Sequence, residues 1–455
     1  MVARAAGRVI PSSELVDISA TIHSNDKFMG AAAAGDGRMV FAPGNANGVG
    51  VFDPTDDSFT LVNICATICS TVKFRGAAVA GDGRVVFAPR NADGVGVFDP
   101  TDDSFTLVDI SATISTDSKF AGAAVAGDGR VVFAPNYADG VGVFDPTDDS
   151  FTLVDISAKI SSNFKFWGAA AVGDGRVVFA PDYADGVGVF DPTDDSFTLV
   201  DISATISSQH SQHRFWGAAV AGDGRVVFAP YHADGVGVFD PTDDSFTLVD
   251  ISATITSDEK FVGAAVAGDG RVVFAPSRAD GVGVFDPTDD SFTLVDIGAT
   301  ISSDGKFWGA AAVGDGRVVF APYHADGVGV FDPTDDSFTL VDISATISST
   351  VKFRGAAVAD DGRVVFSPYY ADGVGVFDPT DDSFTLVDIG ATISSDGKFA
   401  GPAVAGDGRV VFAPYNADGV GVFNPALNLG RCTCCESKLV KRGFNVNRGC
   451  RAMNV

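Results

Sequence analysis

Basic side chains, long apolar runs and cysteines are all scarce in this chain of 455 residues. It has 31 Lys and Arg against 59 Asp and Glu, a formal net charge of −28, whereas nucleic acids and anionic membranes bind clustered positive charge. No run of about 18 apolar residues is present, so we expect no membrane span. Six cysteines are too few for a disulfide framework of this size. The composition therefore excludes nucleic-acid binding and favours a solvated acidic surface.

The two ends of the chain differ from its middle. Residues 1–12 are an N-terminal extension without the apolar segment of a secretory signal, so we expect a cytoplasmic protein. Residues 13–425 form a repetitive domain. Residues 426–455 are a basic tail, expected to be disordered, that holds four cysteines, Cys432, Cys434, Cys435 and Cys450. Their spacing matches no standard metal site.

A repeat of 46 residues dominates the domain, with one interval of 49. Of the 37 Phe residues, 35 occupy four positions of this repeat, so Phe is an architectural residue here. A fixed period of this length indicates a solenoid or a propeller. The nine copies are marked by Phe52, Phe98, Phe144, Phe190, Phe239, Phe285, Phe331, Phe377 and Phe423.

One repeat, residues 307–343, shows the expected strands. We predict strand A at 309–313, a Gly-Asp-Gly hairpin turn, strand B at 317–321, strand C at 327–332, a Pro-Asp turn and strand D at 338–343. Four short strands joined by tight turns are a propeller blade. Strand A consists mainly of Gly, Ala and Val, which suits the crowded innermost position. A parallel β-helix is the alternative with the same period.

The ends of the repetitive domain predict ring closure. It begins with a lone D strand at Glu14–Ile18 and ends with strands A, B and C within 401–423, without a matching D strand. The N-terminal strand would then complete the last blade and leave no exposed sheet edge. We therefore predict an all-β propeller of nine four-stranded antiparallel blades. An open superhelix of blades, or a ring of fewer blades, is the alternative.

The stretch from Gly122 to Pro146, GAAVAGDGRVVFAPNYADGVGVFDP, resembles a blade of the NHL and YVTN propeller superfamily. The likeness lies in the Asp-Gly turn and the Val-x-Val-Phe-Asp-Pro strand, and it covers about residues 13–425. It implies a propeller fold. It implies no single activity, because such propellers include binding modules, lyases and lactonases.

Differences among the repeats point to one face of the ring. The A–B and C–D turns are nearly constant, whereas three places vary: the residue after the Lys-Phe pair, the two residues after strand B, and the D–A linker. In an antiparallel blade these variable places share one face. Tyr, Trp and Arg are enriched at binding surfaces. We predict a binding face made of Trp167, Trp216, Trp308, Arg75, Arg354, Arg90, Arg278, Tyr137, Tyr183, Tyr231, His232, Tyr323, His324, Tyr369, Tyr370 and Tyr415.

Several functions remain open on this basis. The first is a non-enzymatic scaffold that binds a protein or a glycan through the variable face; neutral drift of loops is the competing interpretation. A lyase or lactonase would need a metal or a His/Asp site near the axis, for which His232, His324, Asp234 and Asp326 are the available residues. A three-histidine metal site would use His210, His213 and His232. No motif predicts a cofactor, a catalytic group or a standard metal site.

Overall fold

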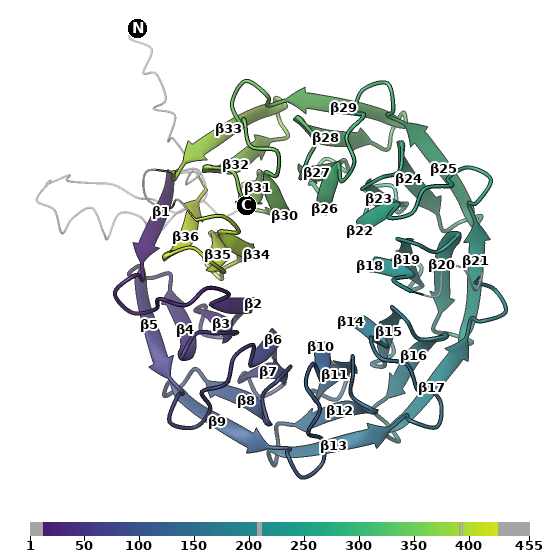
Figure 1. Ribbon diagram of the computed structural model, residues 1–455. Coiled ribbons are helices and arrows are strands. Elements are labelled where there is room, and N and C mark those ends of the chain that lie inside the picture. Colours follow the sequence, from purple (N-terminus) through teal and green to yellow (C-terminus); the bar gives the residue numbers. More distant parts are fainter. Residues whose placement is uncertain (1–11, 207–211, 391–392, 394, 426–455) are drawn as a thin grey trace, which may run out of the picture.

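A computed structural model describes residues 12–206, 212–390, 393 and 395–425 of the chain, and all of the regular elements in these ranges are strands. No helix in the described ranges could therefore cross a membrane. The strands form nine separate four-stranded antiparallel sheets around one axis (Figure 1). The predicted nine-bladed propeller is confirmed.

Each blade contributes one strand to each of four concentric layers. The innermost strands, A, are β2 (Phe28–Ala33), β6 (Phe74–Val79), β10 (Phe120–Val125), β14 (Phe166–Ala171), β18 (Phe215–Val220), β22 (Phe261–Val266), β26 (Phe307–Ala312), β30 (Phe353–Val358) and β34 (Phe399–Val404). The B strands are β3 (Met39–Pro43), β7 (Val85–Pro89), β11 (Val131–Pro135), β15 (Val177–Pro181), β19 (Val226–Pro230), β23 (Val272–Pro276), β27 (Val318–Pro322), β31 (Val364–Pro368) and β35 (Val410–Pro414). The C strands are β4 (Gly48–Asp53), β8 (Gly94–Asp99), β12 (Gly140–Asp145), β16 (Gly186–Asp191), β20 (Gly235–Asp240), β24 (Gly281–Asp286), β28 (Gly327–Asp332), β32 (Gly373–Asp378) and β36 (Gly419–Asn424). The outermost strands, D, are β5 (Ser58–Asn63), β9 (Ser104–Asp109), β13 (Ser150–Asp155), β17 (Ser196–Asp201), β21 (Ser245–Asp250), β25 (Ser291–Asp296), β29 (Ser337–Asp342), β33 (Ser383–Asp388) and, in the last blade, β1 (Ser12–Asp17).

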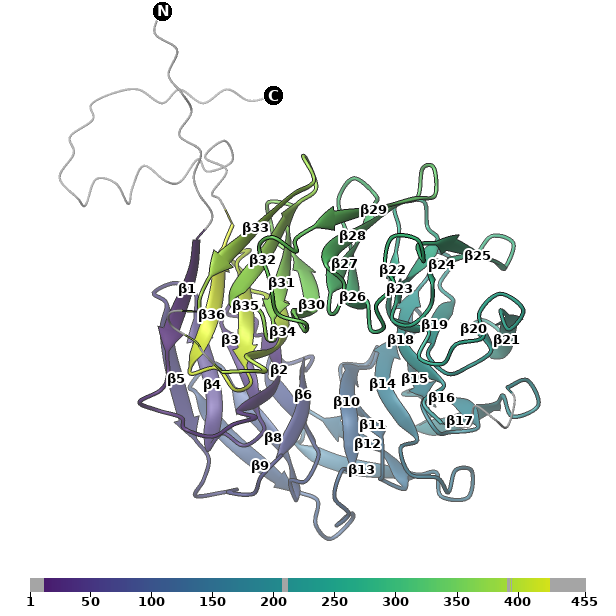
Figure 2. The same cartoon turned by 45° about the horizontal axis from the view of Figure 1, so that its top comes forward.

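The ring closes where the two ends of the repetitive domain meet. Strand β1 pairs antiparallel with β36, from Ser12 opposite Asn424 to Asp17 opposite Gly419, and completes the sheet β1-β36-β35-β34. Figure 2 shows β1 beside β36 at the rim. The ninth blade is therefore shared between the first and last strands, as predicted. This pairing removes the open edge of β36.

The cores lie between blades rather than within them. In one such core, Val319 and Ile343 of the seventh blade pack against Phe353, Phe366 and Phe377 of the eighth. Because successive side chains of a strand point to opposite faces, each sheet presents most of its Val residues to one neighbour and its Phe residues, with the first Val of strand B (Val364 in the eighth blade), to the other. Each blade thus stabilises the next one around the ring.

Arginine side chains join the blades on the face that carries the constant turns, which we call the constant face. Arg225, in the A–B turn of the fifth blade, contacts Asp223 of its own turn at 2.7 Å and Asp290 in the C–D turn of the sixth blade at 2.8 Å. It also donates a hydrogen bond to the carbonyl oxygen of Pro287. Asp residues of these turns therefore cross-link neighbouring blades.

Lysine side chains join the blades on the opposite face, which carries the D–A and B–C connections and which we call the variable face. Lys73, just before β6, is 1% exposed. Its Nζ donates hydrogen bonds to the carbonyl oxygens of Gly44 and Ala46 in the preceding blade, at 3.3 and 3.0 Å. Arg214 takes this place in the fifth blade and contacts Asp185 at 2.7 Å. The Lys of the repeated Lys-Phe pair is thus an interblade contact.

Candidate binding site at the ring axis

A local irregularity in strand A places one of the variable residues of the repeat near the axis. Each innermost strand begins with a buried Phe, continues with the variable residue, and then has a Gly. The register of the A and B strands shifts at this point, as between Phe307 and Ala310, and Gly309 has a φ of +107°. Such bulges redirect a side chain and favour Gly at a positive φ. The strand starts at Phe307 and not at Gly309 as predicted, so the variable residue lies inside the strand.

Three tryptophans from three blades pack together around the axis. The ring centroids of Trp167 and Trp216 lie 5.3 Å apart, and those of Trp216 and Trp308 lie 5.7 Å apart. The second contact reaches past the sixth blade, whose variable residue, Val262, is only 3% exposed. Tyr231 extends the cluster from Trp216, with the ring centroids 5.0 Å apart. The three Trp residues of the sequence thus form one continuous aromatic arc.

An arginine lies at each end of this arc. The guanidinium of Arg75 lies 4.3 Å from the ring centroid of Trp167. The guanidinium of Arg354 lies 5.2 Å from the ring centroid of Trp308 and 5.4 Å from that of Tyr369. Arginine packs well on aromatic faces because its planar cation interacts with the ring quadrupole. Variable residues of five blades therefore form one cluster, the axial cluster: Arg75, Trp167, Trp216, Trp308 and Arg354.

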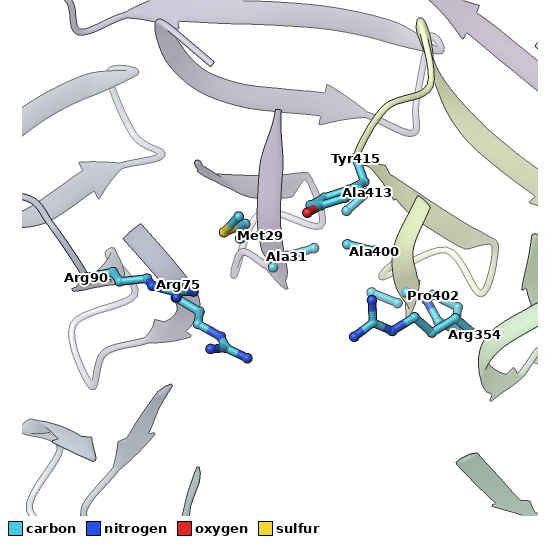
Figure 3. A pocket seen from close by; sticks show the side chains of 12 residues that line it. Met29, Ala31, Arg75, Arg90, Arg354, Ala400, Pro402, Ala413 and Tyr415 are labelled. Carbon is cyan, nitrogen blue, oxygen red and sulfur yellow. The ribbon is translucent and has the colours of Figure 1, made fainter. Parts of the chain in front are cut away.

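A pocket of about 380 Å³ occupies the side of the axis that the tryptophans leave open. Figure 3 shows Arg75 and Arg354 extending into it from opposite sides, with Arg90 beside Arg75. Tyr415 and Met29 line it between the two arginines. The remaining wall is made of small side chains and backbone from β2, β34 and β35. We call this the axial pocket.

The arginines of the axial pocket lack acidic partners. Within the described ranges Arg75, Arg90 and Arg354 form no ion pair with a carboxylate, and Arg75 is half-buried. Burial, with the charges of Arg90 and Arg354, lowers the pKa of Arg75 to about 10. Burial and a hydrogen bond with Asp26 raise the pKa of Tyr415 to about 12. Both groups remain protonated at neutral pH, so the pocket is positively charged.

The other predicted binding residues lie farther from the pocket. Tyr323 packs on Trp308 with the ring centroids 5.1 Å apart, and the ring of Tyr370 stacks on Tyr369. Tyr137 and Tyr183 both pack on Phe164. The ring of His232 stacks on that of Tyr231, and the ring of His324 stacks on that of Tyr323. Arg278 pairs with Glu259 at 3.1 Å. The structure thus separates an axial group of predicted residues from an outer group.

The predicted histidine metal site has a different arrangement. His210 lies outside the described residues. Nδ1 of His213 lies 3.0 Å from Oδ1 of the buried Asp182, and its Nε2 lies 3.1 Å from the hydroxyl of Tyr183. Both ring nitrogens therefore have protein partners and are not free to bind a metal. No group of three metal-binding side chains occurs in the described ranges.

The residues considered for an enzyme do not converge. His232 and His324 belong to the fifth and seventh blades, and neither lines the axial pocket. Asp326 accepts a hydrogen bond from Nζ of Lys352 at 3.1 Å, one of the interblade lysine contacts. Asp234 also has an interaction partner. These Asp residues are part of the repeated framework.

Sequence reasoning missed two contributors to this face. Pro402 lines the axial pocket at a position where the other eight repeats have Ala, and that departure was the available signal. The buried lysines are the second contributor, and at the level of the sequence they only mark the position beside Phe. Their repetition was the available signal for a structural contact. The position is Lys in eight repeats and Arg in the remaining one, whereas solvated surface lysines are not held constant in this way.

No family model and no curated protein matches the sequence. Among solved structures, a dihydro-heme d1 dehydrogenase in complex with DHE has 16% identity and a TM-score of 0.50, covering 82% of this chain and 77% of that one. A virginiamycin B lyase from Staphylococcus aureus has 14% identity and a TM-score of 0.46, covering 77% and 94%. The hydrazine synthase of Kuenenia stuttgartiensis has 12% identity and a TM-score of 0.42, covering 89% and 97%. At these identities a likeness bears on the fold alone. The nine four-stranded sheets confirm the β-propeller fold that the NHL and YVTN resemblance implies.

Proposed function

We propose that the protein is a non-enzymatic binding module that recognises a partner through its variable face, centred on the ring axis. The observation that carries this proposal is the axial cluster, in which Arg75, Trp167, Trp216, Trp308 and Arg354 come from five separate blades and meet. Each of these residues departs from other copies of the repeat, so the fold alone does not require them. Large aromatic and Arg side chains supply much of the affinity of protein interfaces.

A protein partner is favoured over a glycan. Sugars stack on open faces of aromatic rings, and the rings of the arc already contact one another and two guanidinium groups. Arg75 lies over Trp167 and Arg354 over Trp308. Mixed Arg and aromatic clusters of this kind suit a protein surface that offers both apolar and charged groups. A glycan partner is the outcome that a glycan array would reveal.

The proposal can be tested by site-specific photo-crosslinking in an extract of the source organism. A photoreactive amino acid at Tyr370, which is exposed on the variable face, is compared with the same amino acid at Asp102, which is exposed on the constant face. We expect a protein adduct from position 370 and none from position 102. The substitution Trp216→Ala should abolish the adduct, because Trp216 is the centre of the arc.

The controls separate binding from folding. The thermal midpoint of Trp216→Ala must stay near that of the wild type, which we expect because Trp216 is half-buried near the axis and outside the interblade cores. Adducts of equal yield from both faces, or no adduct from position 370, would contradict the proposal. Glycan-array binding that depends on Trp216, without a protein adduct, would replace the protein by a glycan.

A further inference from the structure

Positive charge without a counterion is concentrated at one place in a very acidic protein. The chain carries a formal net charge of −28, yet three guanidinium groups, those of Arg75, Arg90 and Arg354, line the axial pocket. Their side chains donate no hydrogen bond to a residue of the described ranges. None of the described residues that line the pocket is acidic, and the carboxyl group of Asp26 contacts Tyr415 of the lining. The charge of the pocket is therefore not neutralised by the chain itself.

The guanidinium groups of Arg75 and Arg354 are held by contacts that leave their N–H donors free. Trp167 packs on the guanidinium of Arg75, and Trp308 and Tyr369 pack on that of Arg354. An aromatic ring contacts the flat face of a guanidinium and does not use its N–H groups, which lie in the plane. Five N–H donors per side chain thus remain for a ligand in a half-buried site. Hydrogen bonds from an ionised donor to an anion are stronger than neutral ones.

Mutual repulsion makes an anion the expected occupant. The charges of Arg90 and Arg354 and the burial of Arg75 all disfavour protonation of Arg75. An oxyanion between the guanidinium groups would reverse this effect and pair with two planar donors at once. The pocket is large enough, at about 380 Å³, for a group that carries several oxygens.

We propose that the axial pocket binds an oxyanion group with two or more negative charges, supplied by an acidic peptide segment of the partner. This inference rests on the proposed function and names the chemistry of the partner at the axis. Neighbouring Glu or Asp side chains of such a segment would reach Arg75 and Arg354 from above the pocket, while apolar side chains would contact the aromatic arc. A small free polycarboxylate has the same chemistry and is separated from the peptide by the test.

The sequence provides its own reporter for this test. The chain has 3 Trp residues, and all of them belong to the aromatic arc. Trp167 contacts Arg75 and Trp308 contacts Arg354, so intrinsic tryptophan fluorescence reports on the pocket and on little else. Three probes are titrated into the full chain: a capped hexaglutamate peptide, a capped hexaglutamine peptide and citrate.

We expect a saturable change with hexaglutamate and none with hexaglutamine. The substitutions Arg75→Gln and Arg354→Gln should each weaken hexaglutamate binding about tenfold or more, because each removes a charged hydrogen-bond donor. The matched control is Arg278→Gln on the same face, where Arg278 already pairs with Glu259 at 3.1 Å. This control should bind hexaglutamate like the wild type. A thermal melt of each variant verifies folding.

The outcomes test the oxyanion pocket and the proposed binding function independently of each other. Equal loss of binding in all three variants, or no saturation with either anion, overturns the pocket as an oxyanion site. Binding of citrate alone retains the site but overturns the peptide as its ligand. A photo-crosslinked adduct at position 370 that is lost in Trp216→Ala but kept in Arg354→Gln overturns this inference while the proposed function stands. Hexaglutamate binding without any adduct supports the pocket and contradicts the proposed partner.

Discussion

On the constant face, each of the nine arginines of the A–B turns pairs with the Asp two positions before it. Eight of them also pair with an Asp of the next blade. The exception, Arg363, faces the shared ninth blade, where the chain has no C–D turn and Phe423 lies under the guanidinium instead. On the variable face, Arg75, Arg90 and Arg354 have no carboxylate partner in the described ranges.

This difference separates structural charge from charge that folding does not explain. The arginine that recurs in every A–B turn has a fixed acidic partner, and in eight of the nine blades it also connects two blades. Arg75, Arg90 and Arg354 occur in single repeats and lie near one another, and this proximity of like charges raises the free energy of the folded state. Stability therefore accounts for the first group and not for the second. The proposed ligand would give Arg75, Arg90 and Arg354 a physical reason to share one pocket.

Acidification is expected to lower the stability of the ring more than any single substitution, because it acts on the constant-face turns of all blades together. Hydrogen bonds from the side chain and backbone of Thr101 hold the pKa of Asp99 below its usual range, and Thr334 does the same for Asp332. A carboxyl group with a lowered folded-state pKa stabilises the fold above its unfolded pKa, and this stabilisation is lost as the pH falls through the folded pKa. We expect a thermal midpoint that changes little from about pH 7 to 5 and drops below about pH 4.

Differential scanning calorimetry between neutral pH and about pH 3 measures this drop. The substitution Thr101→Val in one blade should reduce the midpoint at neutral pH, because it removes the hydroxyl that contacts Asp99. A midpoint that is independent of pH over the acidic range would show that the repeated Asp residues contribute no net stability.

The second largest loss of stability is expected from replacing Lys73, one of the repeated buried lysines of the variable face. Lys73→Met keeps the length and apolar stem of a side chain that is 1% exposed, but it leaves the carbonyl oxygen of Ala46 without the Nζ donor. The carbonyl oxygen of Gly44 loses the same donor and keeps its hydrogen bond from the backbone N–H of residue 73. Leaving a buried acceptor unpaired costs about 1–3 kcal/mol of unfolding free energy. Urea unfolding measures the loss, with the exposed Arg278→Gln as control. An unchanged stability would show that repetition of a cation is no sign of a structural role.

The sequence predicts the blade well because the signals for it are local. The Asp-Gly hairpin, the Pro-Asp turn and the alternation of Phe with small residues all lie within one repeat. The pairing of β1 with β36 follows from the missing fourth strand of the last repeat. The axial pocket is different, because Arg75 and Arg354 belong to the second and eighth blades and meet only when the ring is closed.

The shape of the pocket also depends on which variable residues lack an aromatic ring. The variable residues of the two blades between the arginines are Met29 and Ala400, and the pocket lies beside them, whereas Trp167, Trp216 and Trp308 fill the other side of the axis. Comparison of the repeats identifies the variable residues. It does not show which of them touch across the axis, because contact depends on the bulge that redirects each side chain.

The third loss of stability is expected from a substitution that forces apart two neighbouring blades on the constant face. A Cβ atom added at Gly127 would lie 2.6 Å from the Cα of Gly175 in the next blade, whereas one added at Gly173 would meet nothing within 4 Å. Both residues are the first Gly of the same turn. Overpacking costs about 1–3 kcal/mol, so Gly127→Ala should destabilise the ring and Gly173→Ala should not. Thermal unfolding of the two variants compares them directly. Equal midpoints would mean that the turns can move apart at little cost.

The smallest change in unfolding free energy is expected from replacing one arginine on each face, which compares the two groups of arginines directly. Arg225→Met removes ion pairs to Asp223 and Asp290, of which the acidic partners are partly exposed, and should cost about 1 kcal/mol or less. Arg75→Met removes no ion pair and relieves repulsion from Arg90 and Arg354, while it loses the contact with Trp167. Since such a contact contributes about 0.5–1 kcal/mol, the two changes nearly cancel and the stability should be close to that of the wild type.

Urea unfolding at low and high salt measures both variants. Salt should reduce the stability difference between Arg225→Met and the wild type, because it screens the ion pairs in the wild type. A loss of stability in Arg75→Met as large as that in Arg225→Met would mean that the axial arginines support the fold, and their lack of acidic partners would then no longer point to a ligand.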